Sequence, residues 1–97
     1  MRSVKRSQVV VPWRAGLHLR PAARLVRLAH TFRSSIWLKC GHQAANLRSV
    51  LSVVALCAVG GTSLEVEATG DDEQEAVAAV ERAFGPDLPD EATVKRS

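Results

Sequence analysis

The residues best suited to chemistry lie in the stretch GLHLRPAARL, residues 16–25 of this 97-residue chain. An imidazole titrates near neutral pH, so it can act as an unprotonated nucleophile and accept a transferable phosphoryl group. If His18 is the N-cap of a helix, the amides of Leu19 and Arg20 point toward an anion at the ring. The Arg20 guanidinium would bind phosphate oxygens as a fork. The stretch therefore predicts a phosphoryl-accepting histidine, and an inert helix cap is the alternative.

Charge is distributed unevenly along the chain. The first acidic residue is Glu65, and all ten charged residues up to Arg48 are basic. The remainder contains the ten acidic residues of the chain and three basic ones, so that the net charge is +3. This asymmetry predicts a surface that meets an acidic protein, nucleic acid or phosphate, although a solvated basic face would give the same pattern.

The elements that must position His18 follow from hydrophobic periodicity. Apolar residues recur at helical spacing from Pro21 to Phe32, and proline is tolerated in the first turn of a helix. Residues 62–68 alternate strictly, which predicts a strand with one buried and one exposed face. A final helix is predicted with Asp71 at its cap position and with Gly85 and Pro86 ending it. The remaining elements are a first strand at 9–11, a hairpin of 34–39 and 43–47, and a short helix within 50–59.

This order of strands and helices predicts an α+β two-layer domain over residues 1–86, followed by a flexible tail at 87–97. The chain has no stretch long enough to span a membrane and no signal-peptide pattern, so we expect a cytoplasmic protein without membrane insertion. With only Cys40 and Cys57 and no secretion signal, we expect two free thiols. Cys40 and His42 do not make a metal pattern, and we expect neither a metal nor a cofactor.

Three segments resemble the HPr family, the histidine phosphocarriers of the bacterial phosphoenolpyruvate-dependent phosphotransferase system. GLHLRPAARL is similar to the family's active-site signature, NLRSVL to the segment around its regulatory serine, and ATGDDEQEAV to the entry into its last helix. They occur in the family's order and spacing, and the resemblance covers residues 4–85. It implies an open-faced β-sandwich, a four-stranded antiparallel sheet covered on one face by three helices.

The resemblance also implies a function. His18 would accept a phosphoryl group from phospho-enzyme I, on Nδ1, and pass it to IIA-type acceptors for sugar uptake or regulation. Arg20 and the Leu19 amide would stabilise the phosphate. The chain would be a recycled carrier, not an enzyme in the strict sense, and we expect a monomer.

Further site residues are implied in the same way. Ser49 would be the regulatory phosphorylation site, with an HPr kinase/phosphorylase as a possible partner, and phosphoserine there would repel enzyme I. Other residues are expected at the interface with enzyme I and the IIA domains; they are Arg24, Arg27, His30, Val50, Leu51 and Val54. The chain departs from the family's common pattern at Ala15, Ser52 and Cys57, and the last stands where glycine or alanine is usual. These departures leave partner choice open.

Two alternatives remain at this stage. One is a nitrogen-type or otherwise regulatory paralogue of the phosphotransferase system. The other is a basic nucleic-acid-binding module, which would bind strands with a steep salt dependence. The basic residues lack interleaved aromatic residues, and Trp13 and Trp37 are expected to pack in the fold, which argues against nucleic-acid binding. If the chain is a phosphocarrier, we expect no nucleic-acid partner.

Overall fold

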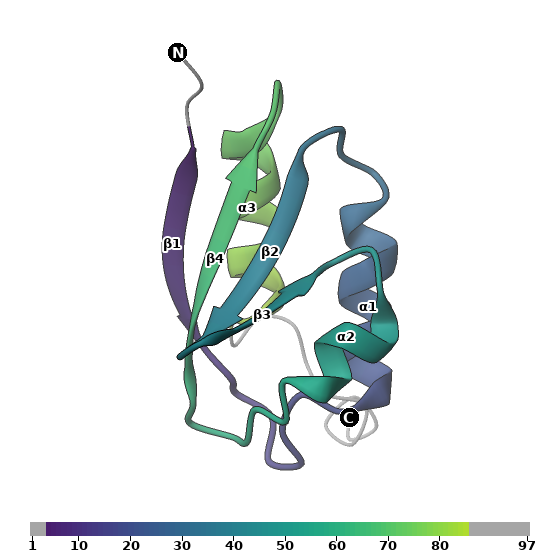
Figure 1. Cartoon of the computed structure of the whole chain (residues 1–97), viewed down its shortest axis with the longest axis vertical. Helices are drawn as coiled ribbons and strands as arrows, with labels where there is room; N and C mark the ends of the chain where they lie inside the picture. Colours follow the sequence, from purple (N-terminus) through teal and green to yellow (C-terminus); the bar gives the residue numbers. More distant parts are fainter. Residues whose placement is uncertain (1–3, 86–97) are drawn as a thin grey trace, which may run out of the picture.

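The computed structural model describes residues 4–85, which form one antiparallel sheet with three helices on one of its faces (Figure 1). The strands lie in the order β1-β4-β2-β3. In chain order the elements are β1 Lys5–Val10, α1 Leu19–Ala29, β2 Ser35–Cys40, β3 Gln43–Asn46, α2 Val50–Ala55, β4 Ser63–Thr69 and α3 Glu73–Ala83. The open-faced α+β sandwich expected from the sequence is confirmed.

The sheet is built around β4, whose alternating sequence places Leu64, Val66 and Ala68 on the buried face. Its register pairs Arg6 of β1 with Glu67, and Glu67 with Trp37 of β2. The inward side chains pack against apolar stripes of the helices, including Leu25 of α1, Val53 of α2 and Val77 of α3. This burial is the main stabilising term of a domain of this size.

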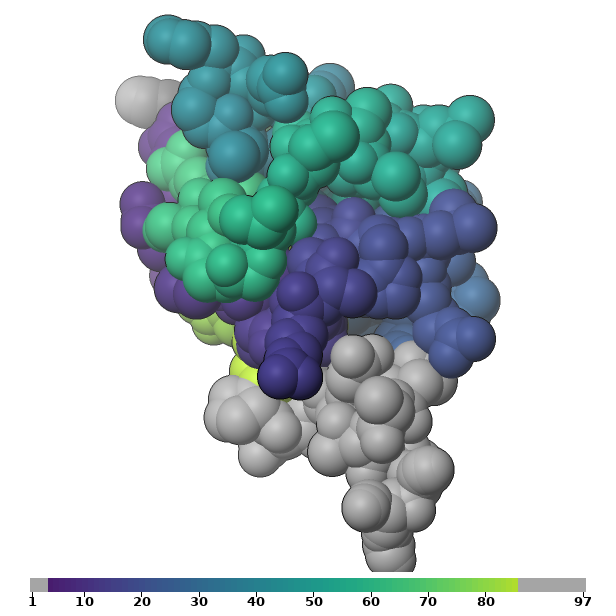
Figure 2. Space-filling model, turned by 90° about the horizontal axis from the view of Figure 1, so that it is seen from below, coloured from purple at the N-terminus to yellow at the C-terminus, as the bar shows by residue number. Residues whose placement is uncertain are grey.

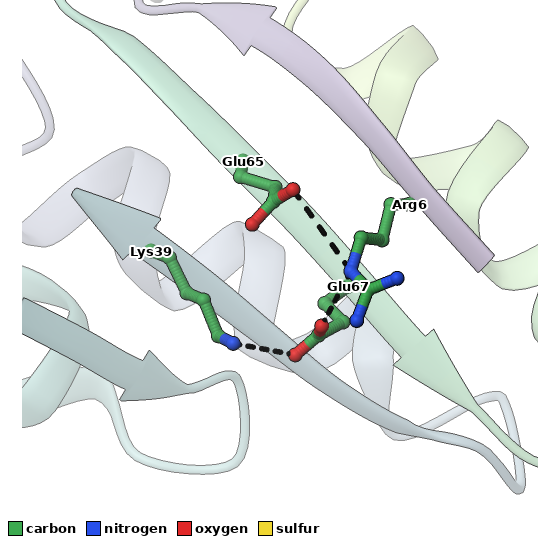
Figure 3. Close-up of polar contacts among 4 residues, drawn as sticks. All are labelled: Arg6, Lys39, Glu65 and Glu67. Atoms are coloured by element: carbon green, nitrogen blue, oxygen red, sulfur yellow. Dashed lines mark hydrogen bonds and ion pairs between the residues drawn. The ribbon is translucent and has the colours of Figure 1, made fainter. Parts of the chain in front are cut away.

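The opposite face of the sheet is polar. Glu67 lies between two cations, at 2.8 Å from Arg6 Nε and 2.8 Å from Lys39 Nζ, and Glu65 lies 4.0 Å from Arg6 (Figure 3). The hydrogen bond from Lys39, followed by that from Arg6, lowers the pKa of Glu67 despite some desolvation. Opposite charges on neighbouring strands thus hold β1, β4 and β2 together on the side that no helix covers.

The predicted bounds of β2, β3 and β4 agree with the structure to within one residue, whereas those of the first strand and the first helix differ by more. The first strand is longer than 9–11 and starts at Lys5, because its polar residues at an edge still pair with β4 from Lys5↔Ala68 to Val10↔Ser63. The first helix ends at Ala29, so Phe32 lies beyond it and packs on the core from a turn.

The cap of the last helix was also assigned to the wrong residue. Asp72, not Asp71, is the N-cap of α3, and its carboxylate accepts from the amides of Arg33 and Ser34 at 2.9 Å and from Ser34 Oγ at 2.6 Å. The first turn is closed by Glu73, whose side chain accepts from the Gly70 amide at 3.0 Å. The Asp72 carboxylate therefore joins the N-terminus of α3 to the residues just before β2. Sequence spacing could not show this, because the partners are 38 and 39 residues away.

The predicted tail at 87–97 lies outside the described residues. Among residues 4–85, none of the helices has the length and apolar character needed to cross a membrane.

Candidate functional site

The loop that precedes α1 is fixed by contacts with the segment that follows α2. Leu17 N–H donates to Ala58 O at 2.8 Å, and Gly16 N–H donates to Trp13 O at 2.9 Å. Gly16 has a φ of +81°, and a Cβ there would lie 2.6 Å from Ala58 O. Only glycine fits this close approach without a shift of the backbone. The glycine two residues before His18 is thus what lets the chain turn into the helix against Ala58.

His18 is the N-cap of α1, as the sequence predicts. Its backbone is extended, with φ −93° and ψ −170°, and its carbonyl accepts the first helical hydrogen bond from Ala22 at 3.0 Å. The imidazole makes no cap hydrogen bond, so it does not serve the capping role that many N-cap side chains have. The half-buried ring is therefore held at the positive end of α1 by its backbone and not by a bond to a helix amide.

A shallow groove lies beside this helix end. It has a volume of about 500 Å³, and we call it the basic groove; its lining residues are His18, Leu19, Arg20, Ala23, Arg24 and Arg27. Three of the six are arginines, and the first turn of α1 contains no acidic residue. The amide of Leu19 belongs to this first turn, where a helix has no carbonyl four residues earlier to accept from it. The groove combines fixed positive charge with a helix N-terminus, which favours a phosphate group.

His30 lies away from the basic groove. It is the C-cap of α1, and its Nδ1 lies 2.8 Å from Val26 O. Twelve residues of helix separate it from His18, which corresponds to about 18 Å. The structure thus places five of the expected residues along the basic groove and His30 outside it, at the C-cap of α1; the five are His18, Leu19, Arg20, Arg24 and Arg27.

The expected apolar interface residues of α2 separate into two groups. Leu51 is 77% exposed, whereas Val50 and Val54 are half-buried and pack against the core. Two further exposed apolar side chains were not identified from the sequence, Leu19 at 60% and Val59 at 67%. Leu19 lies outside the apolar stripe of α1 that faces the core, and this position in the sequence could have predicted its exposure. Val59 belongs to a continuous apolar run, in which no periodicity distinguishes it from core.

These apolar side chains come from segments that meet on one face of the molecule. The loop before α1, the start of α1, α2 and the turn after α2 adjoin there (Figure 2). The helices α1 and α2 also pack directly on each other. An exposed apolar patch beside a basic groove is typical of a transient protein interface.

Ser49 is the N-cap of α2, and its Oγ accepts from the Ser52 amide at 3.2 Å. The serine is half-buried. Its capping role is therefore present in the structure, on an element that contributes to the same face as the basic groove (Figure 2).

The aromatic and thiol side chains lie elsewhere. Trp13 is 4% exposed and packs against Phe84 with ring centroids 5.2 Å apart, as expected. Trp37 is 37% exposed on the polar face of the sheet, so the expectation that it packs in the fold is only partly met. Cys40 and Cys57 are free thiols, as predicted.

Comparison with known proteins matches these features to one family. The family model described as PTS HPr component phosphorylation site matches residues 5–85. Phosphocarrier protein HPr of Treponema pallidum (strain Nichols) is 42% identical over 71 residues, which are 73% of this chain and 81% of that protein. Phosphocarrier protein NPr of Proteus mirabilis (strain HI4320) is 35% identical over 79 residues, which are 79% of this chain and 87% of that protein.

The fold matches as well. The crystal structure of HPr-C-His from Thermoanaerobacter tengcongensis superposes with a TM-score of 0.83 at 31% identity, covering 90% of this chain and 98% of that one. The match of the family model extends from β1 to the residue after the C-cap of α3, and so includes every helix and strand described. The chain therefore belongs to the HPr family, the phosphocarriers of the phosphoenolpyruvate-dependent phosphotransferase system.

Proposed function

We propose that His18 accepts a phosphoryl group from phospho-enzyme I and passes it to a IIA-type acceptor. The observation that carries this proposal is the placement of His18 at the N-cap of α1, with Arg20 lining the same groove and no cap bond to the ring. A histidine that merely capped the helix would not need this combination.

The transfer step follows from the chemistry of a neutral imidazole. The lone pair of one ring nitrogen, Nδ1 by resemblance to the family, attacks phosphorus while the other nitrogen carries the proton. The bond from phosphorus to nitrogen forms as the bond from phosphorus to enzyme I breaks, and no proton has to leave the ring. Handing the group to a IIA acceptor reverses these events with a new nucleophile.

The groove stabilises the charge of the phosphoryl group. Phosphoryl transfer depends mainly on positioning and charge neutralisation. The Arg20 guanidinium and the Leu19 amide supply hydrogen-bond donors, and the helix dipole contributes about 0.3–1 kcal/mol at an exposed site. The exposed apolar residues Leu19, Leu51 and Val59 then form the surface on which enzyme I and the IIA domains dock.

The test is intact-mass analysis after incubation with phosphoenolpyruvate and a cognate, active enzyme I. We expect one acid-labile phosphoryl group, which is absent in His18→Ala. His42→Ala is the matched control, because His42 is exposed in the turn between β2 and β3. Retention of the phosphoryl group in His18→Ala would overturn the proposal, as would no gain in the parent.

A regulatory role within the same system is the second candidate. It is favoured by the likeness to a phosphocarrier protein NPr at 35% identity, which lies between the 32% and 36% identity of two relatives called HPr. Incubating the phosphorylated chain with sugar-type and with nitrogen-type IIA proteins distinguishes the two, since the acceptor that removes the group faster is the partner. In both cases we propose a cytoplasmic, monomeric carrier. A nucleic-acid-binding role has less support, because Trp13 is buried and Trp37 lies on the sheet rather than in the basic groove.

A further inference from the structure

The imidazole of His18 depends on the backbone for its position. The ring makes no cap hydrogen bond, and the residue is half-buried at the start of α1. Phosphoryl transfer needs the attacking nitrogen in line with the leaving group, and a misplacement of about 1 Å lowers the rate of such a step on the order of a hundredfold. The contacts that hold the backbone before His18 therefore matter for the reaction.

These contacts join the loop before α1 to the segment that follows α2. At the start of the loop, Gly61 N–H donates to Val11 O at 2.8 Å. At its end, directly before His18, Leu17 N–H donates to Ala58 O at 2.8 Å. Both ends of the loop are thus bonded to the same short segment.

Two glycines, one in the loop and one in the segment after α2, allow the two backbones to approach closely. A Cβ on Gly16 would lie 2.6 Å from Ala58 O, and a Cβ on Gly60 would lie 2.7 Å from Trp13 O. The atoms met are backbone atoms, which cannot turn aside as the end of a flexible side chain can. Leu17 and Ala58 are also buried, in a close-packed interior that transmits a shift. A larger residue at either glycine must therefore move the loop relative to the segment.

Cys57 directs the chain from α2 to this contact. Its N–H donates to Val54 O at 3.0 Å, and its φ is +53°. A left-handed residue at this place ends a helix, and the next residue is Ala58, whose carbonyl binds the Leu17 amide. The end of α2 and the backbone before His18 are therefore connected through two consecutive residues.

We propose that the turn of residues 57–60 positions His18 for phosphoryl transfer. The Ala58 carbonyl holds the Leu17 amide and so fixes where the imidazole lies. The turn acts through the backbone of the loop and not on the phosphoryl group, so its members are positioning residues. This inference rests on the phosphoryl-accepting role proposed for His18.

The turn also connects the phosphoryl acceptor to the docking surface. Val59, which is exposed, lies between Ala58 and Gly60. The turn adjoins the loop before α1 and the start of α1 on one face of the molecule (Figure 2). A partner that docks on Val59 therefore meets the imidazole at a distance that the turn has fixed.

The position of the imidazole can be observed without phosphoryl transfer. Gly16→Ala presses a Cβ against Ala58 O, and we expect it to shift the NMR signals of the carbon-bound ring protons of His18. Gly41→Ala is the matched control, because Gly41 also has a positive φ, +61°, and nothing lies within 4 Å of a Cβ there. It introduces comparable backbone strain in the turn between β2 and β3 and should leave the His18 signals in place.

Gly60→Ala tests the turn from its other side. Its Cβ meets Trp13 O, and the φ of Gly60 is not positive, so this variant carries no left-handed strain. We expect a smaller shift of the same His18 signals. If Gly16→Ala does not fold, Gly60→Ala decides alone. Signals that stay in place in the folded variants of both glycines, or that move as far in Gly41→Ala, would overturn the proposal.

The consequence for the reaction is measured by single-turnover kinetics with phospho-enzyme I. We expect Gly16→Ala to lower the saturating rate about ten- to a hundredfold. The half-saturating concentration of enzyme I should stay within about twofold, because the side chains of the basic groove and Leu51 are untouched. Gly41→Ala should match the parent in both quantities.

The two kinetic quantities separate positioning from docking. A loss confined to the half-saturating concentration, or an equal loss of rate in Gly41→Ala, would contradict a positioning role for the turn. If enzyme I phosphorylates none of the proteins, the parent included, the proposed function fails. The ring signals then still decide whether the turn positions the imidazole.

Discussion

Cys57 is a residue whose type does not suit the conformation of its backbone. Its φ is +53°, and among the described residues it is the one with a positive φ that is not glycine. It follows the C-cap of α2 at Leu56, a place where helices commonly end in a left-handed glycine. An L-residue in that conformation costs about 1–2 kcal/mol.

We therefore expect Cys57→Gly to raise the free energy of unfolding by about 1 kcal/mol, since the relieved strain exceeds the extra chain entropy of glycine. The exposed thiol loses little packing. Urea denaturation measures the change. Ala55→Gly, at the exposed last residue of α2, is the control and should lower stability, because glycine there adds chain entropy to the unfolded state and relieves no strain. A Cys57→Gly protein no more stable than the parent would contradict the assignment of strain.

Arg20 tests the electrostatic part of the proposed site. A hydrogen bond to a charged group is worth about 1.5–3 kcal/mol, so we expect Arg20→Ala to slow phosphoryl acceptance by about ten- to a hundredfold. Arg33→Ala is the matched control, because the Arg33 side chain is exposed beyond the far end of α1 and lies 3.9 Å from Asp71. Single-turnover kinetics with phospho-enzyme I give both rates. Equal slowing in the two variants would mean that overall charge, and not the groove, matters.

At the scale of elements, α2 combines a structural and a proposed regulatory role in one serine. Ser49→Ala removes the acceptor for the Ser52 amide and should cost about 1 kcal/mol of stability without slowing phosphoryl acceptance. Ser49→Asp keeps an N-cap acceptor and adds the negative charge that phosphoserine would add. It should keep stability and weaken docking of enzyme I by repulsion.

Unfolding curves and acceptance rates for both variants separate the two roles. A Ser49→Asp protein that takes the phosphoryl group as fast as the parent would count against regulation through charge. Slow acceptance by Ser49→Ala would show that the cap itself shapes the docking surface.

The elements also show where sequence reasoning succeeds and where it stops. The alternation of Leu64, Val66 and Ala68 is local, and it predicted β4 with its buried face correctly. The spacing after His18 likewise predicted the position of α1 and the His18 cap. The role of Asp72 was missed because its partners, Arg33 and Ser34, are brought to it only by the tertiary fold. The exposure of Val59 was missed because it belongs to a continuous apolar run without periodicity, in which only the tertiary fold decides which side chains are buried.

At the scale of the whole molecule, charge has different uses on two surfaces. Around α1 the arginines Arg20, Arg24 and Arg27 line a groove open to a ligand. On the far face of the sheet, Arg6 and Lys39 bind Glu67 and join three strands (Figure 3). The second arrangement joins strands of the sheet, whereas the first is the one that we propose for binding. Salt should therefore weaken partner docking more than it weakens folding, because the Glu67 pairs are short and its carboxylate is largely covered.

Two carboxylates that join distant segments should make the free energy of unfolding fall at low pH. Hydrogen bonds from Ser34 and from the Arg33 amide lower the pKa of Asp72, and the bond from Lys39 lowers that of Glu67. Both pKa values are lower in the folded than in the unfolded chain. The stabilisation is thus complete above about pH 5, above both unfolded values, and is lost as the pH falls through the folded values.

We expect Asp72→Asn and Glu67→Gln to be less stable than the parent at neutral pH and to approach it as the pH falls toward 2, because the parent loses its own advantage there. Urea midpoints measured at several pH values test this. Asp71→Asn is the control, since that side chain is exposed and lies 3.9 Å from Arg33, and it should follow the parent at every pH. If the gap between Asp72→Asn and the parent stays constant down to pH 2, the carboxylate contributes through shape and hydrogen bonding alone, and the charge at the junction of α3 and β2 contributes nothing to stability.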